Sequence, residues 1–480
     1  MAVIKDIIKI SGGYTDVVDL TNHYSDTKKN AELMERYKPI KAHREAFGRI
    51  ANSLNQQDKR FYFLSGSYGT GKSHLCLMAA NYFSRLSTSM EMKTFFDNYK
   101  EAQQAVKLKS GEQLNERSAD ELVSKRKKGQ YLIAMCRYGL NLEFEGTILR
   151  AIQESLEETG LELETHFKEA LRKIDSWESK KNEKRFFEDL EKELNTKHPG
   201  LTIKKLKQGL SETKEEIFQI FKECYKKITS TDFVYDRDNL QNILTDILSS
   251  QEFKEKYSGI VVIYDEFGYA LDGNKVSLSK MQEFAQFCTQ SKMQHHPIVF
   301  IGTGHKAFRN HGQVGDQIHF DTISARVEEI PLQTQGMEDI IGAIISPKTE
   351  DKEWKNNVAP NENIFSFFSG QCSRLKIFDW LKAPIIENNI IQNIYPMHPL
   401  ATYALLQLAK EVGSDNRSIF QFFSPRINNE TGEWENIQPY SYTWFITNNE
   451  IATSGKLNFY TTDLLYEYFK DGIKSKTKKM

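Results

Sequence analysis

The sequence predicts an α/β fold, in which a parallel β-sheet is covered on both faces by helices. Three observations support this prediction. A glycine-rich motif lies between an apolar strand and an apolar helix, a strand rich in β-branched residues ends in Asp-Glu, and predicted strands alternate with helices. Such alternation is typical of parallel sheets, whose ligands bind beyond the carboxyl ends of the strands.

Composition narrows the class of protein. The chain has 480 residues, of which 39% are hydrophobic and 27% charged, and its net charge is −1. It is therefore expected to form two or three globular domains, with any polyanion site confined to a local patch. No apolar run approaches the ~20 residues of a membrane span, and the N-terminus lacks a signal-peptide core, so no membrane partner is expected. Five scattered cysteines without a C-x-x-C pair favour a reducing cytoplasm.

Two segments precede the glycine-rich motif. Residues 1–35 are mixed and polar and are interpreted as an N-terminal extension packed on the core. From Pro39 to Leu54, apolar residues recur at helical spacing, which predicts a helix before the first strand.

The glycine-rich motif follows a strand predicted over residues 61–65 and reads G-x-x-x-x-G-K-S, the Walker A phosphate loop. Its glycines let the backbone wrap around phosphates, and the following helix presents free N–H groups to the anion. We expect Lys72 to reach the β- and γ-phosphates of ATP and Ser73 to hold Mg²⁺. A chance glycine turn, the alternative, does not account for the position of the motif. The residues expected to bind nucleotide here are Gly66, Ser67, Tyr68, Gly69, Thr70, Gly71, Lys72 and Ser73.

A second motif begins with the β-branched strand predicted from residue 259 and ends in Asp265-Glu266, the Walker B pattern. Asp265 is expected to order the Mg²⁺ shell, and Glu266 to polarise the attacking water as general base. The alternative is a strand that simply ends in an acidic turn.

After a mostly apolar strand predicted over Gln130–Cys136 and the Walker B strand, a fourth buried strand starts at Pro297 and ends in polar residues. Thr303 is the first choice for a side chain that senses the γ-phosphate beside the acidic motif, and His305 the second. The alternative is an ordinary exit from strand to loop. A fifth strand is predicted just after Arg326, at about residues 327–332.

The rest of the chain reads as helical. Residues from about 145 to 258 form a predicted helical insertion, whose charge runs are either solvated helix faces or a surface for nucleic acid or a partner. Residues 346–480 are predicted to be mainly helical, with a loop over 424–445. The chain stops where more structure is expected, which suggests a truncated protein or the N-terminal part of a larger one.

With these residues in view, the chain resembles the AAA+ ATPases over roughly residues 36–425. The resemblance implies an ATPase core over 36–345, interrupted by the insertion, and a helical lid over 346–480. One segment before the phosphate loop, Pro39…His43-Arg44-Glu45, resembles a segment that packs near adenine in these ATPases. A later segment, Ser324-Ala-Arg326, resembles the box whose arginine finger acts on a neighbouring subunit. Gly413-Ser-Asp-Asn-Arg417 resembles the motif whose arginine contacts phosphate in the same subunit. Either arginine could instead be an ordinary surface or capping residue.

A narrower resemblance is to the large ATPases of bacterial phage-defence systems of the BREX type. It rests on His74 directly after the phosphate loop, on Tyr395-Pro-Met-His-Pro-Leu400 followed by Asn416-Arg417-Ser-Ile-Phe, and on Asp463-Leu-Leu-Tyr-Glu-Tyr-Phe469. It implies that His74 belongs to the nucleotide-binding residues, that ATP and Mg²⁺ are the cofactors, and that the protein is a cytoplasmic homo-oligomer. The implied partners are other subunits of a defence complex, and DNA either directly or through a partner.

Three hypotheses about function follow. The first is an AAA+ ATPase that drives or licenses a DNA-associated defence complex. The second is a nucleotide-gated switch or scaffold with slow hydrolysis, although Glu266 favours turnover. The third is an initiator or helicase loader, which predicts a DNA-binding domain after the lid; no clear helix-turn-helix follows residue 425. The patterns of protein kinases do not occur.

Overall fold

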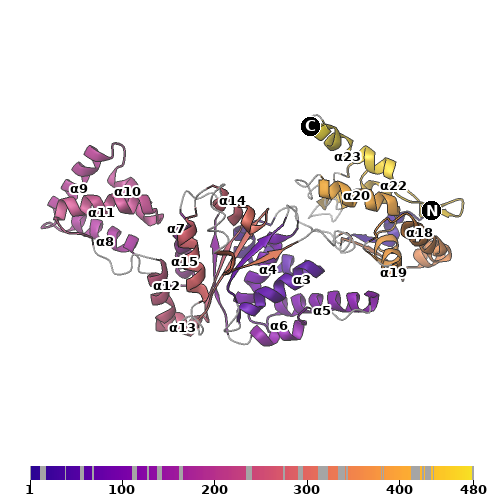
Figure 1. Ribbon diagram of the computed structural model, residues 1–480, viewed down its shortest axis with the longest axis horizontal. Helices are drawn as coiled ribbons and strands as arrows, with labels where there is room; N and C mark the ends of the chain where they lie inside the picture. The colour runs from indigo at the N-terminus through magenta and orange to yellow at the C-terminus, as the bar shows by residue number, and fades with distance from the viewer. Residues whose placement is uncertain are drawn as a thin grey trace.

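The computed structural model is centred on a five-stranded parallel sheet (Figure 1). The residues it describes are 2–10, 18–37, 39–54, 59–66, 70–110, 116–126, 129–137, 143–161, 166–233, 240–273, 276–289, 296–311, 323–332, 341, 344–379, 381, 383–411, 422–423, 426–427, 434–435 and 437–477. The strands of the sheet are β2 (Phe61–Ser65), β3 (Leu132–Cys136), β4 (Ile260–Tyr264), β5 (Ile298–Gly304) and β6 (Val327–Pro331). Every residue of the first four is buried, as continuous apolar runs predict for parallel strands. The predicted α/β class with a parallel sheet is confirmed.

The strands lie in the order β3-β4-β5-β2-β6, so that β5 separates the two motif-bearing strands. Ser65, the last residue of β2, pairs with Gly304 of β5, and Tyr264, the last residue of β4, pairs with Gly302. The carboxyl ends of β2, β4 and β5 therefore meet at one edge. This edge carries the two predicted nucleotide-binding motifs.

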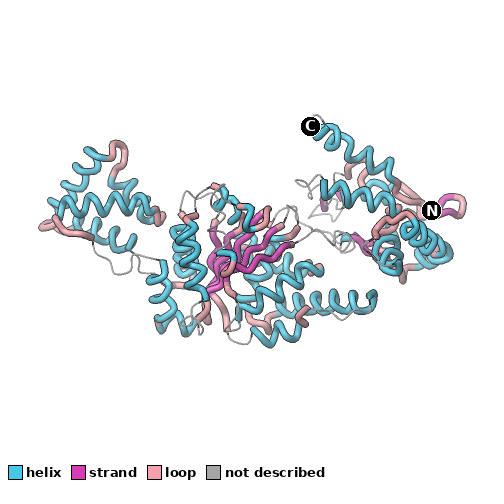
Figure 2. Tube along the Cα trace, in the orientation of Figure 1, coloured by secondary structure: helices cyan, strands magenta, loops and turns pink. Residues whose placement is uncertain are grey.

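Helices cover both faces of the sheet, as Figure 2 shows. Side chains at alternate strand positions enter two separate cores; Tyr62 and Leu64 face one, and Phe61 and Phe63 the other. The first face is covered by α3 (Lys41–Ala51), α4 (Lys72–Ser84), α5 (Met90–Ser110) and α6 (Ala119–Lys125). The second is covered by α7 (Phe144–Glu158), α12 (Leu240–Ser249), α13 (Gln251–Lys256), α14 (Phe267–Asp272) and α15 (Leu278–Thr289).

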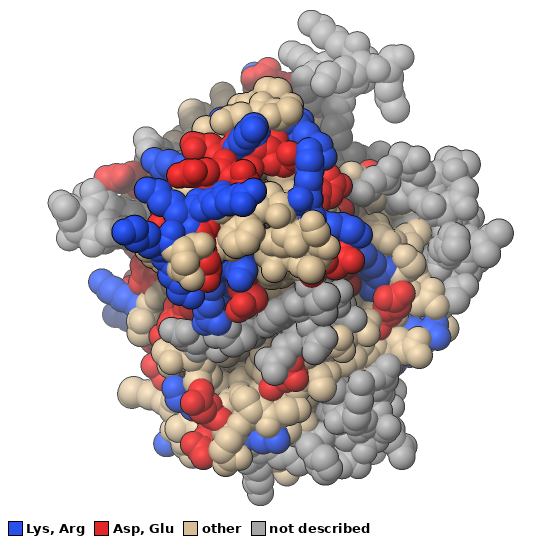
Figure 3. Space-filling model, turned by 90° about the vertical axis from the view of Figure 1, so that its left-hand side faces the viewer, with Lys and Arg blue, Asp and Glu red and all other residues tan. Residues whose placement is uncertain are grey.

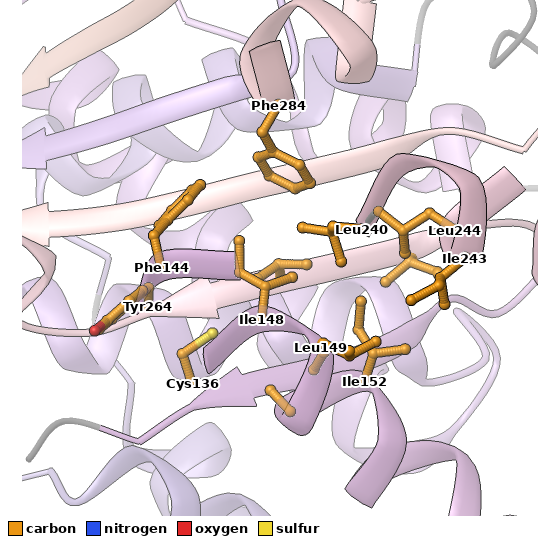
Figure 4. Packing of buried hydrophobic residues seen from close by; sticks show 14 of the residues in the cluster. Cys136, Phe144, Ile148, Leu149, Ile152, Leu240, Ile243, Leu244, Tyr264 and Phe284 are labelled. Atoms are coloured by element: carbon orange, nitrogen blue, oxygen red, sulfur yellow. The ribbon is translucent and has the colours of Figure 1, made fainter. Parts of the chain in front are cut away.

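The chain between β3 and β4 is helical, but its helices serve two purposes. Helices α7 and α12 pack together on the sheet, with Ile148 and Ile152 of α7 beside Ile243 and Leu244 of α12 (Figure 4). Four further helices stand away from the sheet at one end of the molecule (Figure 1). These are α8 (His166–Ser179), α9 (Lys184–Lys197), α10 (Ile203–Ser211) and α11 (Glu215–Thr229), called here the helical arm.

The helical arm has its own apolar centre. Trp177 is fully buried there and stacks on Tyr225, with ring centroids 5.5 Å apart. Its outer surface carries Lys and Arg interspersed with Asp and Glu (Figure 3). Many of these charges are paired within the arm; Lys207, for example, lies 2.8 Å from Asp175. The charge runs were interpreted either as solvated helix faces or as a surface for nucleic acid or a partner. The ion pairs within the arm favour solvated helix faces.

A second body is built from both ends of the chain. Strand β1 (Ile8–Ile10) pairs antiparallel with β7 (Ile345–Pro347), and the backbone N–H of Ile4 donates to the carbonyl of Asn449. Ile4, Ile7 and Ile8 are buried in the apolar core of this C-terminal body. Its other elements are η1 (Ile4–Ile7), η6 (Trp354–Val358), η7 (Ala359–Asn361), α18 (Asn363–Arg374), α19 (Ala383–Ile385), η8 (Ile386–Gln392), α20 (Pro399–Glu411), β8 (Arg426–Ile427), β9 (Trp434–Glu435), α22 (Tyr442–Asn448), β10 (Ala452–Thr453), β11 (Lys456–Leu457) and α23 (Thr462–Thr477).

The predicted N-terminal extension is thus divided. Residues 2–10 lie in the C-terminal body, whereas α1 (Leu20–Ser25) and α2 (Thr27–Arg36) pack beside the sheet. Helix α2 is tied to α4 by a buried pair of amides, in which Asn81 Nδ2 donates to Asn30 Oδ1 at 2.7 Å. The amide pair fixes α2 against the helix that follows the phosphate loop.

The loop predicted over 424–445 needs a correction, because α22 begins at Tyr442. The Ser441 hydroxyl accepts a hydrogen bond from the Trp444 N–H at 3.0 Å and caps the helix. The aromatic and β-branched residues Tyr442, Thr443 and Trp444 are weak helix formers, so local propensity predicts no helix here.

Candidate nucleotide-binding site

The phosphate loop leaves β2 at Gly66 and enters α4 at Lys72. Gly66 donates its N–H to the carbonyl of Gly304 at 3.1 Å, which ties the start of the loop to β5. A Cβ on Gly66 would lie 2.7 Å from the Leu332 carbonyl oxygen, so no larger residue fits. Gly71 has φ +78°, a left-handed conformation that favours glycine. The predicted binding residues Ser67, Tyr68 and Gly69 lie outside the described residues.

Lys72 begins α4 and is 8% exposed. Its ammonium donates to the carbonyl of Gly66 at 2.7 Å, so the side chain folds back across the loop. Burial lowers the pKa of Lys72, and the nearby carboxylates of Glu266 and Asp265 oppose this shift. The ammonium and the N-terminus of a 13-residue helix together place positive potential beside the loop.

The acidic motif lies against the start of the same helix. The Ser73 hydroxyl donates to Asp265 Oδ2 at 2.7 Å. The other oxygen of this carboxylate accepts a 2.6 Å hydrogen bond from the Thr303 hydroxyl. The two residues predicted to hold Mg²⁺ are therefore in direct contact, although they are 192 positions apart in the sequence.

Glu266 has a left-handed backbone, with φ 57° and ψ 27°. This conformation costs a non-glycine residue on the order of 1 kcal/mol or more. Its N–H donates to the Thr303 hydroxyl at 2.8 Å and to Asp265 Oδ1 at 3.2 Å, and its carbonyl accepts from the Tyr269 N–H. These bonds hold the strained turn in place, with the Glu266 carboxylate near enough to Lys72 to affect its pKa.

Thr303 is fully buried between the two motifs. Its single hydroxyl proton is donated to Asp265, and its oxygen accepts from Glu266. In this arrangement the hydroxyl fixes the acidic turn to β5. Direct sensing of a γ-phosphate by Thr303 stays a prediction.

Two aromatic residues beyond β5 lie next to this turn. His305 stacks on Tyr269 of α14, with centroids 5.1 Å apart, and burial lowers its pKa. His311 is buried behind it and lies 3.2 Å from Asp272. His305 therefore packs on the helix that follows Glu266.

The sequence did not reveal a layer of side chains behind the loop. His43 of α3 lies 2.8 Å from the Thr70 carbonyl oxygen and 3.0 Å from the Tyr37 hydroxyl. His74 points to the same side, where Nε2 lies 3.4 Å from the Leu33 carbonyl oxygen and the ring meets Tyr37 edge-on. Burial lowers the pKa of each histidine to about 4. The structure thus places the predicted nucleotide-binding residue His74 against α2.

Arg44, in the segment that resembles an adenine-binding box, makes a buried ion pair. Its Nε lies 2.8 and 2.9 Å from the carboxylate oxygens of Glu116, and Nη1 donates to the Pro39 carbonyl at 2.7 Å. The ion pair fixes α3 to the segment before α6. The hydrogen bond to Pro39 holds the chain just before α3. No spacing in the sequence indicated Glu116 as a partner.

Another connection missed from the sequence runs through Glu329 of β6. Its carboxylate accepts hydrogen bonds from the Ser65 hydroxyl at 2.7 Å and from the Phe308 N–H at 3.2 Å. The sequence shows a glutamate inside a predicted strand. Which residues this glutamate contacts depends on the order of the strands in the sheet, and that order cannot be read from the sequence.

Of the two predicted arginines, only Arg326 lies within the described residues, and its backbone position is remote from this site. Arg326 precedes β6, whose first residue, Val327, pairs with Phe61, the first residue of β2. Arg326 therefore lies at the amino edge of the sheet, roughly 16 Å from the carboxyl edge at about 3.3 Å per residue. Arg417 lies outside the described residues.

No group of three or more His, Cys, Asp and Glu side chains arranged to hold a metal occurs in the described part of the chain. Ser73 and Asp265 supply only two oxygen ligands. This is a fitting set for Mg²⁺, which commonly takes one or two protein ligands and completes its shell with phosphate oxygens and water.

Comparison with known proteins gives no match, whether to family models, to curated proteins or to solved structures. Within the described residues, no helix is both long and apolar enough to cross a membrane.

Proposed function

We propose that this protein binds ATP with Mg²⁺ and hydrolyses it. The observation that carries the proposal is the hydrogen-bonded set of Ser73, Asp265, Thr303 and Glu266 beside Lys72. A phosphate loop alone indicates nucleotide binding. A glutamate held next to the acidic residue adds a candidate base for hydrolysis.

The proposed roles follow from the positions of the side chains. When nucleotide binds, the Lys72 ammonium leaves the Gly66 carbonyl and donates to phosphate oxygens instead. The N-terminus of α4 adds to the attraction of these phosphates. Ser73 and Asp265 would hold Mg²⁺, which neutralises phosphate charge when it is bound with the nucleotide. Glu266 orients a water molecule and accepts its proton, while Thr303 keeps the backbone of Glu266 in place. Catalysis would rely mainly on positioning and on electrostatic stabilisation.

The resemblance to AAA+ ATPases extends the proposal to an assembly. In it, the C-terminal body corresponds to the lid, and Arg326 reaches the nucleotide of a neighbouring subunit. The position of Arg326 supports this part, because a side chain at the amino edge of the sheet is remote from the phosphate loop of its own chain. The resemblance also leads us to propose a DNA-linked defence role.

The proposal is tested by steady-state ATP hydrolysis with the wild type, Lys72→Ala and Glu266→Gln, each with and without duplex DNA. We expect Mg²⁺-dependent turnover that is lost in both variants, while Glu266→Gln still binds ATP. Full activity of Lys72→Ala would refute the site. Tight binding with almost no wild-type turnover would favour a nucleotide-gated switch, and stimulation by DNA would support the DNA-linked role.

A further inference from the structure

The loop peptide between Thr70 and Gly71 is contacted from behind by His43. Ring atom Nε2 lies 2.8 Å from the Thr70 carbonyl oxygen, and Nδ1 lies 3.0 Å from the Tyr37 hydroxyl oxygen. His43 is 7% exposed and Tyr37 is 3% exposed. The contact is close, since a Cβ added to Gly71 would lie 2.5 Å from His43 Cε1.

The chemistry of these partners determines where the proton of the ring lies. A peptide carbonyl can only accept a hydrogen bond, so Nε2 of His43 must be the donor to Thr70. Burial lowers the pKa of His43 to about 4, so the ring is neutral near pH 7 and carries one proton. Nδ1 is then the acceptor, and the Tyr37 hydroxyl donates to it. The Thr70 carbonyl thereby selects the tautomer, and the Tyr37 hydroxyl, which can donate or accept, completes the hydrogen bonding of the ring.

The bond to Thr70 also fixes the direction of an N–H group. In a planar trans peptide, the carbonyl of one residue and the N–H of the next point in opposite directions. Because the Thr70 carbonyl points at α3, the Gly71 N–H points away from α3. The flipped peptide would present a carbonyl oxygen where an N–H is needed, and glycine permits such a flip more readily than other residues.

We propose that His43, held in place by Tyr37, is a positioning residue that keeps the Gly71 N–H directed at the phosphates of the nucleotide. The inference rests on the proposed function, because it assigns a role to a side chain behind the same loop. His43 acts through the Thr70–Gly71 peptide. The inert alternative is a histidine that only fills space between α3 and the loop.

Two substitutions of His43 distinguish these roles. In His43→Gln the side-chain amide reaches about as far as Nε2 and can still donate to Thr70. In His43→Asn the amide reaches only as far as Nδ1 and cannot. Tyr37→Phe keeps the aromatic ring and removes the hydroxyl that bonds Nδ1 and holds the imidazole against Thr70.

The experiment measures kcat and KM for ATP with Mg²⁺ in the wild type, these three variants and Lys72→Ala, with thermal melting as a check on folding. We expect His43→Asn to raise KM about three- to tenfold, the change that corresponds to one lost hydrogen bond. Tyr37→Phe should raise KM about two- to fivefold, and His43→Gln should stay within about twofold of the wild type.

If His43 only fills space, its substitution would change the melting temperature or the active fraction, but His43→Gln and His43→Asn would have the same KM for ATP. Equal KM values for the two His43 variants would therefore overturn the inference, as would an unchanged KM in Tyr37→Phe. Should the His43 variants fail to fold, Tyr37→Phe decides alone. Lys72-independent activity would instead refute the proposed function, and the inference with it.

Discussion

Thr303 shows how one hydroxyl can organise the acidic motif. It donates to the carboxylate of Asp265 and accepts from the N–H of Glu266, and it is fully buried. Both partners belong to the turn that carries the proposed base. Without the hydroxyl, this turn loses part of the support for its left-handed backbone.

We therefore expect Thr303→Val, which keeps the shape but removes the hydroxyl, to lower ATP turnover about 10- to 100-fold and to leave ATP binding nearly unchanged. Unpaired Asp265 and Glu266 groups should also cost about 1–3 kcal/mol of stability. Steady-state kinetics, nucleotide titration and urea unfolding measure the three effects. Thr303→Ser is the matched control, and wild-type turnover in Thr303→Val would contradict the role.

Glu266→Gln removes the proposed base and keeps the size of the side chain. Loss of general base catalysis typically lowers rates by about 10²–10⁴-fold, so turnover should fall by that order while ATP stays bound. Rapid-quench hydrolysis and filter binding report the two quantities. Glu283→Gln changes an exposed carboxylate on α15 and should have no effect. Normal turnover in Glu266→Gln would place the base elsewhere.

The histidines behind the loop should make stability depend on pH. Burial lowers the pKa of His43 and His74 from 6.5 to about 4; the charge of Arg44 adds to the shift of His43, and His43 adds to the shift of His74. Between these values the unfolded chain binds more protons than the folded one, so stability falls as pH falls from about 6.5 to 4. For each ring, this change amounts to roughly 2–4 kcal/mol of unfolding free energy. That stability is fully present above pH 6.5 and is lost as the pH falls towards 4.

Urea unfolding between pH 7.5 and 4.5 tests this dependence. The decline should be shallower in His43→Gln, because one of the two titrating rings is gone. The same slope in wild type and variant would show that His43 does not titrate in this range.

At the scale of elements, the strands could be predicted and their order could not. Each central strand is a continuous apolar run, which marks a buried parallel strand in the sequence itself. That β5 lies between β2 and β4 depends on pairings between distant segments, and no local pattern records them. The contact of Thr303 with Asp265 follows from this order.

The same reasoning explains what the sequence missed in the site. Ser73, Asp265 and Glu266 belong to motifs with fixed spacing. Tyr37 belongs to no motif, and the resemblance of the His43 segment to an adenine-packing box did not indicate Thr70 as a partner; the packing of α3 against the loop brings both residues to it. His74 follows the loop in sequence, but the turn of the helix directs it towards α2.

Strand β1 was missed because three residues are too few to show a periodicity. The preceding helix η1 nevertheless contributes the fully buried Ile4, and we expect Ile4→Ala to destabilise the C-terminal body by about 2–5 kcal/mol. Hydrogen exchange in residues 344–358 should rise, while exchange in β2 and β4 changes less. Lys9→Ala, at an exposed position of β1, is the control. Equal protection in Ile4→Ala and wild type would contradict the packing role.

At the scale of the whole molecule, Arg326 links the site to assembly. If it acts on a neighbouring subunit, Arg326→Ala and Lys72→Ala should each be inactive alone, yet a mixture should recover part of the activity. The recovery arises because Lys72→Ala subunits offer an intact arginine to the intact phosphate loops of Arg326→Ala. ATPase assays across mixing ratios measure it, with exposed Arg374→Ala as the control. No recovery at any ratio would count against action between subunits.

The pairing of β1 with β7 also has a consequence for synthesis on the ribosome. Ile8 pairs with Pro347, so its partner is made about 340 residues later. At about 5–20 residues per second, this interval lasts roughly 17–70 s. During that time Ile4, Ile7 and Ile8 have no finished core to enter. The first strand of the chain is thus among the last to reach its place, and a chaperone that holds short apolar segments would act on it during this interval.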